Sequence, residues 1–118
     1  MVEEDKRFRE FNDVLVEAIE ESISEILGHR ALEALYVGLE KRYDVKRDEV
    51  PYRIETAFKI LSDTFGTKGS QILGMRVVRR LYKKLNLPLY ESPSRSFSKY
   101  IENAKNALAQ SPLDESAA

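Results

Sequence analysis

Apolar residues recur at helical spacing along almost the whole chain, and this periodicity constrains the fold more than any other feature. Apolar residues at positions i, i+3, i+4 and i+7 line one side of a helix, whereas a half-buried strand needs strict alternation of apolar and polar residues. No stretch alternates long enough to predict a strand. The sequence therefore predicts an all-α fold, a compact bundle of about five amphipathic helices that bury their apolar stripes against one another.

The expected helix boundaries follow from glycine, proline and capping residues. Gly28 and Gly66 are predicted stops because glycine takes the backbone conformations that end a helix without strain. Asp48 and Pro51 are typical of a helix start, and Thr67 suits the N-cap of the helix after Gly66. The predicted helices span residues 4–27, 29–43, 51–65, 68–85 and about 96–109.

A length of 118 residues predicts one domain, which we place at residues 1–110, with a serine-rich loop at 91–98 and a mobile tail at 111–118. The absence of cysteine excludes disulfides and thiolate zinc sites. No apolar run approaches the roughly 18 residues of a membrane span, and the acidic N-terminus is unlike a signal peptide. We therefore expect a cytoplasmic protein with no membrane contact. High charge with few Met, Gln and Asn is typical of heat-loving proteins.

The residues that could carry chemistry are few. The single histidine, His29, stands without a nucleophile or a second metal ligand at helical spacing, so we expect no catalytic residues. The acidic cluster of residues 44–49 lacks the glycine of a calcium loop and is interrupted by two bases. Residues 66–70 depart from the phosphate-binding loop because the lysine precedes the second glycine. The sequence predicts neither a metal nor a cofactor.

Charge is segregated along a chain whose 19 bases and 20 acids nearly cancel. Residues 1–27 hold nine acids and three bases, net −6, whereas residues 67–100 hold eight bases and one acid, net +7. The acids of the first helix lie on its polar face, which we interpret as solvated. The near-neutral total therefore conceals an acidic first helix and a basic fourth helix.

The basic face of the predicted helix 68–85 is one candidate functional surface. Together with the preceding helix and a short glycine turn it imitates a helix-turn-helix, so nucleic-acid binding is one hypothesis. A recognition helix, however, uses its N-terminal half on base edges, while these bases crowd the C-terminal half, where the helix dipole favours cations without any ligand. The candidate surface for a partner protein or nucleic acid comprises Lys68, Arg76, Arg79, Arg80, Lys83 and Lys84.

The favoured alternative is a protein that works through protein contacts. The basic face of helix 68–85 would then meet the acidic face of the first helix, either within one chain or across a symmetric dimer. Three apolar residues fall outside the predicted core stripes, namely Ile72, Leu73 and Tyr90. Because exposed apolar groups rimmed by charge are typical of partner surfaces, these three form the candidate self-association surface of an expected homodimer.

Residues 20–87 also carry a family resemblance. The segments Ala34-Leu35-Tyr36, Tyr43-Asp44-Val45, Asp48-Glu49-Val50-Pro51, Phe65-Gly66 and Arg80-Leu81-Tyr82 resemble the archaeal Nitrosopumilus output domain family, fifth type, formerly a domain of unknown function. The resemblance implies an archaeal origin, an all-helical fold and a place as an output or regulatory module. It implies no catalytic residue and no cofactor.

Overall fold

The protein is all-helical, as its periodicity predicts. A computed structural model describes residues 6–109, with side chains from residue 10 onward, and contains no strand in that part of the chain. Its elements are the α-helices α1 (Lys6–Leu27), α2 (His29–Tyr43), α3 (Ile54–Lys84) and α4 (Phe97–Ala109) and the 3₁₀-helix η1 (Arg47–Tyr52). The expected helix start near residue 4 and the expected tail at 111–118 lie outside the described residues.

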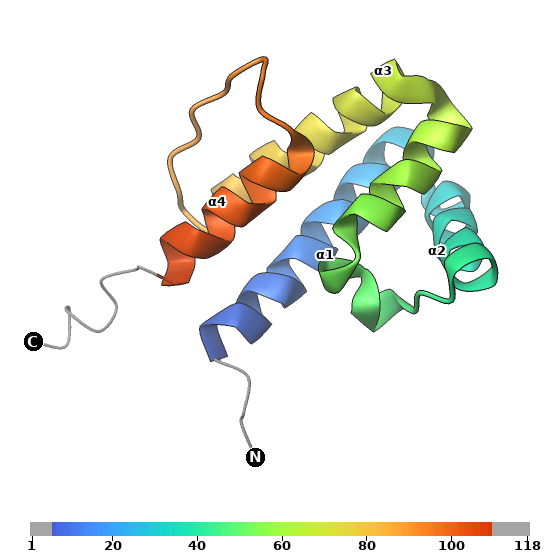
Figure 1. The fold of residues 1–118 in the computed structure, drawn as a ribbon, viewed down its shortest axis with the longest axis horizontal. Coiled ribbons are helices and arrows are strands. Elements are labelled where there is room, and N and C mark those ends of the chain that lie inside the picture. Colours follow the sequence, from blue (N-terminus) through green and yellow to red (C-terminus); the bar gives the residue numbers. More distant parts are fainter. Residues whose placement is uncertain (1–5, 110–118) are drawn as a thin grey trace, which may run out of the picture.

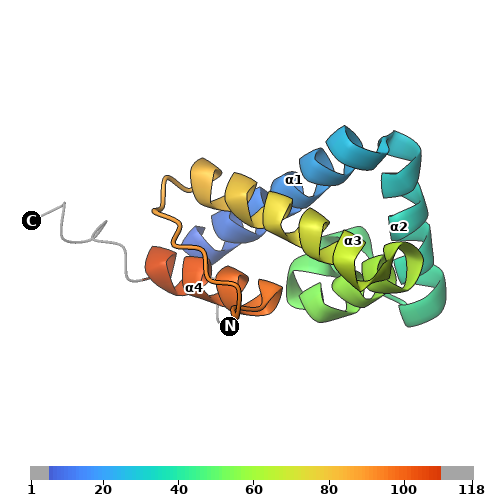
Figure 2. The ribbon, with the colours of Figure 1, turned by 90° about the horizontal axis from the view of Figure 1, so that it is seen from above.

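Helix α1 lies at the centre of the arrangement. It contacts α2, α3, α4 and η1. Figure 1 shows the part of α3 that follows its bend lying beside α1, with α4 alongside the same part of α3. Figure 2 shows α2 folding back from the end of α1 towards the bend of α3. The other elements of the bundle therefore all pack against α1.

The two helices predicted on either side of Gly66 are both present, and they meet at that residue in a sharp bend under the common label α3. Gly66 has φ 81° and ψ 165°, and it is the one non-helical residue inside α3. A side chain at this φ is strained, which explains why glycine stands here. The expected N-cap role of Thr67 is wrong, because the direction changes at Gly66 alone and Thr67 lies inside α3. We call residues 54–65 and 67–84 the first and second segments of α3.

The helix start predicted at Pro51 is replaced by a short 3₁₀-helix. Arg47–Tyr52 forms η1, and α3 begins only at Ile54. The residue before η1 is Lys46, and its backbone N–H donates to the Glu49 carboxylate at 2.8 Å. Pro51 fits this element because a 3₁₀-helix of six residues has few hydrogen bonds to lose. The expected cap at Asp48 is therefore wrong, because Asp48 lies inside η1 and the residues that precede η1 and α3 are Lys46 and Arg53. Pro51 lies in η1 and not in the first turn of α3.

The core is formed by apolar residues from every element. Those of α1 include Phe11, Leu15 and Ile23, each at most 1% exposed. Ile26 and Phe65, which the helical pattern places inward, are 39% and 41% exposed. Both stand at the end of a helical segment, where the stripe extends past the neighbour that would cover it. The predicted burial of the apolar stripes is therefore confirmed along the helices but not at the ends of these two segments.

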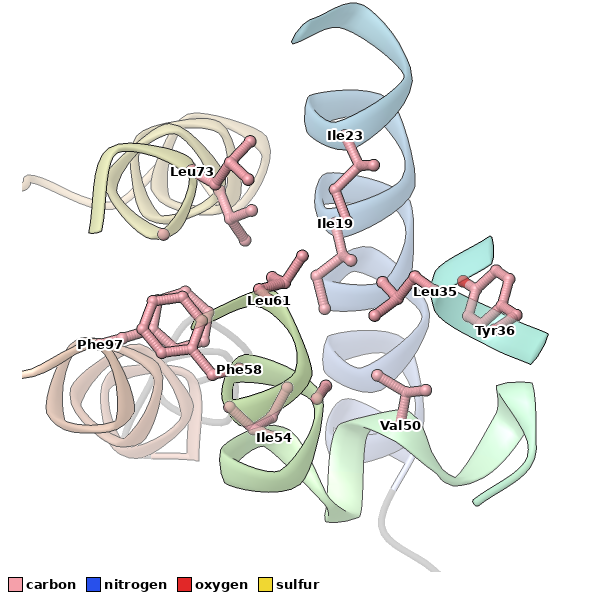
Figure 3. Close-up of a pocket in the computed structure, with 13 residues that line it drawn as sticks. Ile19, Ile23, Leu35, Tyr36, Val50, Ile54, Phe58, Leu61, Leu73 and Phe97 are labelled. Atoms are coloured by element: carbon pink, nitrogen blue, oxygen red, sulfur yellow. The ribbon is translucent and has the colours of Figure 1, made fainter. Parts of the chain in front are cut away.

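A small apolar cavity of about 20 Å³ remains where α1, α2, α3 and α4 meet. Figure 3 shows its wall, with Ile19 and Ile23 from α1 opposite Leu61 and Leu73 from the two segments of α3. This volume matches about one water molecule, and a water there would find almost no hydrogen-bond partner. It is far below the roughly 300–1,000 Å³ of small-molecule sites. The cavity is a packing defect.

Beside this cavity, two aromatic rings approach the backbone of α3 closely at Gly74. The rings of Phe58 and Phe97 stack with centroids 4.6 Å apart and planes 10° apart. A Cβ at Gly74 would lie 2.7 Å from Cζ of Phe58 and 3.1 Å from Cδ1 of Phe97. The missing side chain of Gly74 therefore lets the stacked rings pack directly against the α3 backbone.

We predict that Gly74→Ala lowers the free energy of unfolding by about 1–3 kcal/mol, because the added methyl group must displace the stacked rings. Urea denaturation followed by circular dichroism measures this change. Gly38→Ala is the matched control: its Cβ meets only Cδ1 of Ile60 at 3.8 Å, an ordinary contact, so helix propensity should make that variant slightly more stable. Equal stability of Gly74→Ala and the wild type would contradict this packing.

Candidate functional site

Three cations of the basic face of α3 pair with the acidic face of α1. The guanidinium of Arg80 lies 3.2 Å from Glu21 and 2.9 Å from Glu25. Lys84 lies 3.2 Å from the Glu17 carboxylate and 3.1 Å from that of Glu21. Arg76 lies 3.3 Å from Glu25. We call these six residues the α1–α3 ion-pair network, and it closes within one chain.

Spacing along the two helices explains the network. The three carboxylates of α1 and the three cations of α3 each recur every four residues, and residues four apart in a helix lie one above the other. The order of the partners, from Glu17 with Lys84 to Glu25 with Arg76, shows that α1 and the second segment of α3 run antiparallel. Because the pairs lie at the surface, the loss of hydration that opposes ion pairing is small. Hydrogen bonds from Lys84 and Arg80 lower the pKa of Glu21.

The remaining candidate cations divide into two kinds. Arg79 forms a two-bond pair with Glu91, with Nε and Nη2 each 3.0 Å from a carboxylate oxygen. Lys68 and Lys83 are exposed, and within the described residues neither makes an ion pair. Five of the six candidate cations, all except Lys68, line one open surface hollow together with Glu21. The structure therefore brings the predicted basic residues together, but carboxylates already hold four of them.

The three candidate apolar residues differ in their exposure to solvent. Ile72 is 60% exposed and Tyr90 is 76% exposed. Leu73, however, is 3% exposed and belongs to the core. Its expected place on a self-association surface is wrong because it lies four residues before Val77 and eight before Leu81, both buried, on one stripe. The exposed apolar part of the surface is reduced to Ile72 and Tyr90.

The loop that carries Tyr90 is fixed by hydrogen bonds to α4. The Tyr100 hydroxyl accepts a bond from the Ser92 N–H at 2.8 Å and donates to the Ser92 carbonyl at 3.1 Å. Arg95 donates to the Tyr90 carbonyl at 2.7 Å, and its guanidinium lies 5.1 Å from the centre of the Tyr100 ring. Helical spacing identifies Tyr100 as a core residue but gives no sign of these partners.

A second polar cluster, which the sequence does not reveal, joins α1, α2 and η1. The Glu20 carboxylate accepts hydrogen bonds from the Tyr36 hydroxyl at 2.5 Å and from Nε of Arg47 at 2.6 Å. The bond from Arg47 is the main cause of the lowered pKa of Glu20. Burial and the bond to Glu20 raise the pKa of the Tyr36 hydroxyl. Since the pairs are 16 and 27 residues apart in sequence, only the folded chain brings them together.

Other kinds of site find little support among the described residues. His29 is exposed, and its ring nitrogen lies 3.8 Å from the Glu33 carboxylate on the next turn. No group of three or more His, Asp or Glu side chains in residues 10–109 is placed to hold a metal ion. No helix in the described part of the chain is long and apolar enough to cross a membrane.

The fold and the surface define an all-α helical bundle with an internally paired basic helix. Comparison of the chain with models of protein families, with curated proteins and with solved structures finds no match. The resemblance to the archaeal output domain family therefore stays a prediction.

We predict that Glu20→Gln lowers the free energy of unfolding at pH 7 by about 1 kcal/mol, because the ionised carboxylate holds both Arg47 and Tyr36. The folded-state pKa of Glu20 lies below 4.5, so its stabilisation is complete above pH 4.5 and is lost as the pH falls through that lowered pKa. Urea titrations at pH 7 and pH 3 should show the difference between variant and wild type shrinking at pH 3. Glu33→Gln, whose carboxylate is exposed beside His29, is the control and should show no such trend.

Proposed function

We propose that this chain is a non-enzymatic helical regulatory module that acts through protein contacts and associates with a second copy of itself. The observation that carries the proposal is the outward face of the second segment of α3, where Ile72 is 60% exposed among cations. Tyr90 extends this surface from the loop that Glu91 ties to Arg79. We call Lys68, Ile72, Arg79, Lys83 and Tyr90 the outer face. Large apolar side chains rimmed by charge are typical of protein interfaces.

The state of the carboxylates supports a non-enzymatic role. A general acid needs a carboxyl whose pKa is raised towards neutrality. Bonded cations instead lower the pKa values of Glu20, Glu21 and Glu91. Each of these groups is therefore ionised near pH 7 and serves as an acceptor for a neighbouring cation.

The regulatory role, an archaeal source and a cytoplasmic location come from the resemblance and the composition, and they remain predictions. The ion pairs between α1 and α3 support a heat-loving source, because the desolvation penalty of ion pairs falls as the temperature rises and surface networks of ion pairs are typical of such proteins.

We predict that the wild-type chain forms a dimer of about twice its 13.6 kDa mass and that Ile72→Ser weakens it at least roughly tenfold, as the loss of a central interface side chain does. Light scattering over a concentration series measures both effects. Val37→Ser is the matched control, since Val37 is 50% exposed on α2, away from the outer face, and its variant should dimerise normally. A wild-type mass near 13.6 kDa at every concentration would contradict self-association.

Nucleic-acid binding through the basic hollow is the second candidate. The clustering of Arg76, Arg79, Arg80, Lys83 and Lys84 around one hollow favours it. The carboxylates that already hold four of the six candidate cations weigh against it, because a phosphate must displace them.

If nucleic acid is the ligand, DNA or RNA binding should weaken steeply with salt, and the double variant Arg79→Glu, Arg80→Glu should abolish it. Fluorescence anisotropy with a labelled oligonucleotide at low and high salt measures this. We expect that the wild-type chain does not bind the oligonucleotide even at low salt. Binding by the wild type that is lost in the double variant would overturn this expectation.

A further inference from the structure

The bend in α3 concentrates a large change of direction in one residue. The backbone is helical on both sides of Gly66, whose φ of 81° and ψ of 165° alone depart from the helix. A Cβ built at Gly66 meets no atom within 4 Å, so the positive φ, and not lack of space, is what disfavours a side chain there. A hydrogen bond spans the bend, between the hydroxyls of Ser62 and Ser70 at 2.8 Å, and straightening would have to break it. Rotation about this single residue would convert α3 into one straight helix from Ile54 to Lys84.

Two exposed apolar side chains flank the bend. Phe65 is 41% exposed and Ile72 is 60% exposed, and they stand seven residues apart with Gly69 between them. In a straight helix residues at i, i+4 and i+7 lie on one side. Straightening would therefore align Phe65, Gly69 and Ile72 into a stripe two turns long, with glycine at its middle.

The contacts between α1 and the second segment of α3 could form between two copies as well as within one chain. Opposite charges at matching intervals hold α1 to this segment, and the same antiparallel fit is available to the α1 helix of another copy. The second segment of α3 also carries α4 with it, since the Tyr82 hydroxyl donates to the Tyr100 carbonyl at 2.7 Å. Residues 67–109 can thus be exchanged as a unit.

We propose that the dimer of this chain is domain-swapped: α3 straightens at Gly66, and residues 67–109 pack on α1 of the second copy. This inference rests on the proposed self-association and specifies how the two copies associate. The exchange preserves the contacts of α1 and replaces each intramolecular ion pair with an equivalent one between chains, so its cost is low. It adds one new contact, where the Phe65 and Ile72 stripes of the two straightened helices cross and Gly69 permits their close approach.

Two charge-reversed variants test the exchange directly. One carries Glu17→Lys, Glu21→Lys and Glu25→Lys, and the other carries Arg76→Glu, Arg80→Glu and Lys84→Glu. Each alone places like charges between α1 and α3, whether as a monomer or as a dimer. A swapped heterodimer of the two restores opposite charges at both α1–α3 contacts.

The two variants are refolded together from urea and analysed by native mass spectrometry, which separates them by mass. We expect heterodimers in strong excess over both homodimers and a melting temperature above that of either variant alone. The matched control pair is Glu33→Lys with Arg30→Glu, which reverses exposed charges of α2 outside both the network and the outer face and should give a statistical mixture. Refolding the mixture keeps the test valid even if one variant does not fold alone.

Two negative results are distinguishable. If the wild type dimerises but the mixed variants show no preference for each other, the exchange is overturned and the proposed self-association stands. If the wild type is monomeric at every concentration, the proposed function is contradicted and the exchange with it.

The hinge is tested separately by Gly66→Ala. Alanine is strained at the positive φ of the bent form but not in a straight helix, so the variant should dimerise roughly tenfold or more tightly. Gly28→Ala is the control, because Gly28 has nearly the same φ of 96° and also an unobstructed Cβ position, but it stands outside α3. Tighter dimers for Gly28→Ala and not for Gly66→Ala would overturn the assignment of the hinge.

Discussion

Burial of the apolar side of α1 is the interaction on which the rest of the structure depends. Every other helix in the described part of the chain contacts α1, and its residues Leu15 and Ala18 are completely buried. Each large core side chain contributes roughly 1.5–3 kcal/mol when it leaves water. The polar side of the same helix faces the second segment of α3. A single helix therefore organises both the core and the charged surface.

The ion pairs contribute differently from the core. Exposed pairs contribute about 0–1 kcal/mol each and are weakened by salt, so they add little to the total stability. Their value lies in selecting which faces meet, because only this side of α1 presents three acids at the interval of the three cations of α3. A shift by one turn would keep most of the pairs, since Lys84 already contacts both Glu17 and Glu21. The network thus favours contact between these two faces, whereas the register and direction of the helices depend on the burial of their apolar stripes.

Helices and their stripes were predictable because periodicity and glycine act locally. The sequence places α1 and α2 almost to the residue and marks Gly66 as an interruption. It does not reveal that only one residue separates the two segments of α3. Leu73 lies next to the basic arc in sequence, but the stripe that it shares with Val77 decides its burial.

Polar partners could not be predicted for a different reason. The sequence suggested that acidic and basic faces meet, since both recur at helical spacing, but it left open whether they meet within one chain. The bonds of Glu20 to Tyr36 and Arg47, and of Tyr100 to Ser92, join residues whose distance is set by how helices and loops pack. No local pattern encodes them.

The apolar cavity has a consequence for how the bundle responds to compression. A void of about 20 Å³ among well-packed side chains disappears when the chain unfolds, and this favours the smaller-volume unfolded state under hydrostatic pressure. The void adjoins α1, both segments of α3 and α4. The volume change of unfolding therefore depends on how these helices meet, and a substitution that fills the void should make the protein less sensitive to pressure.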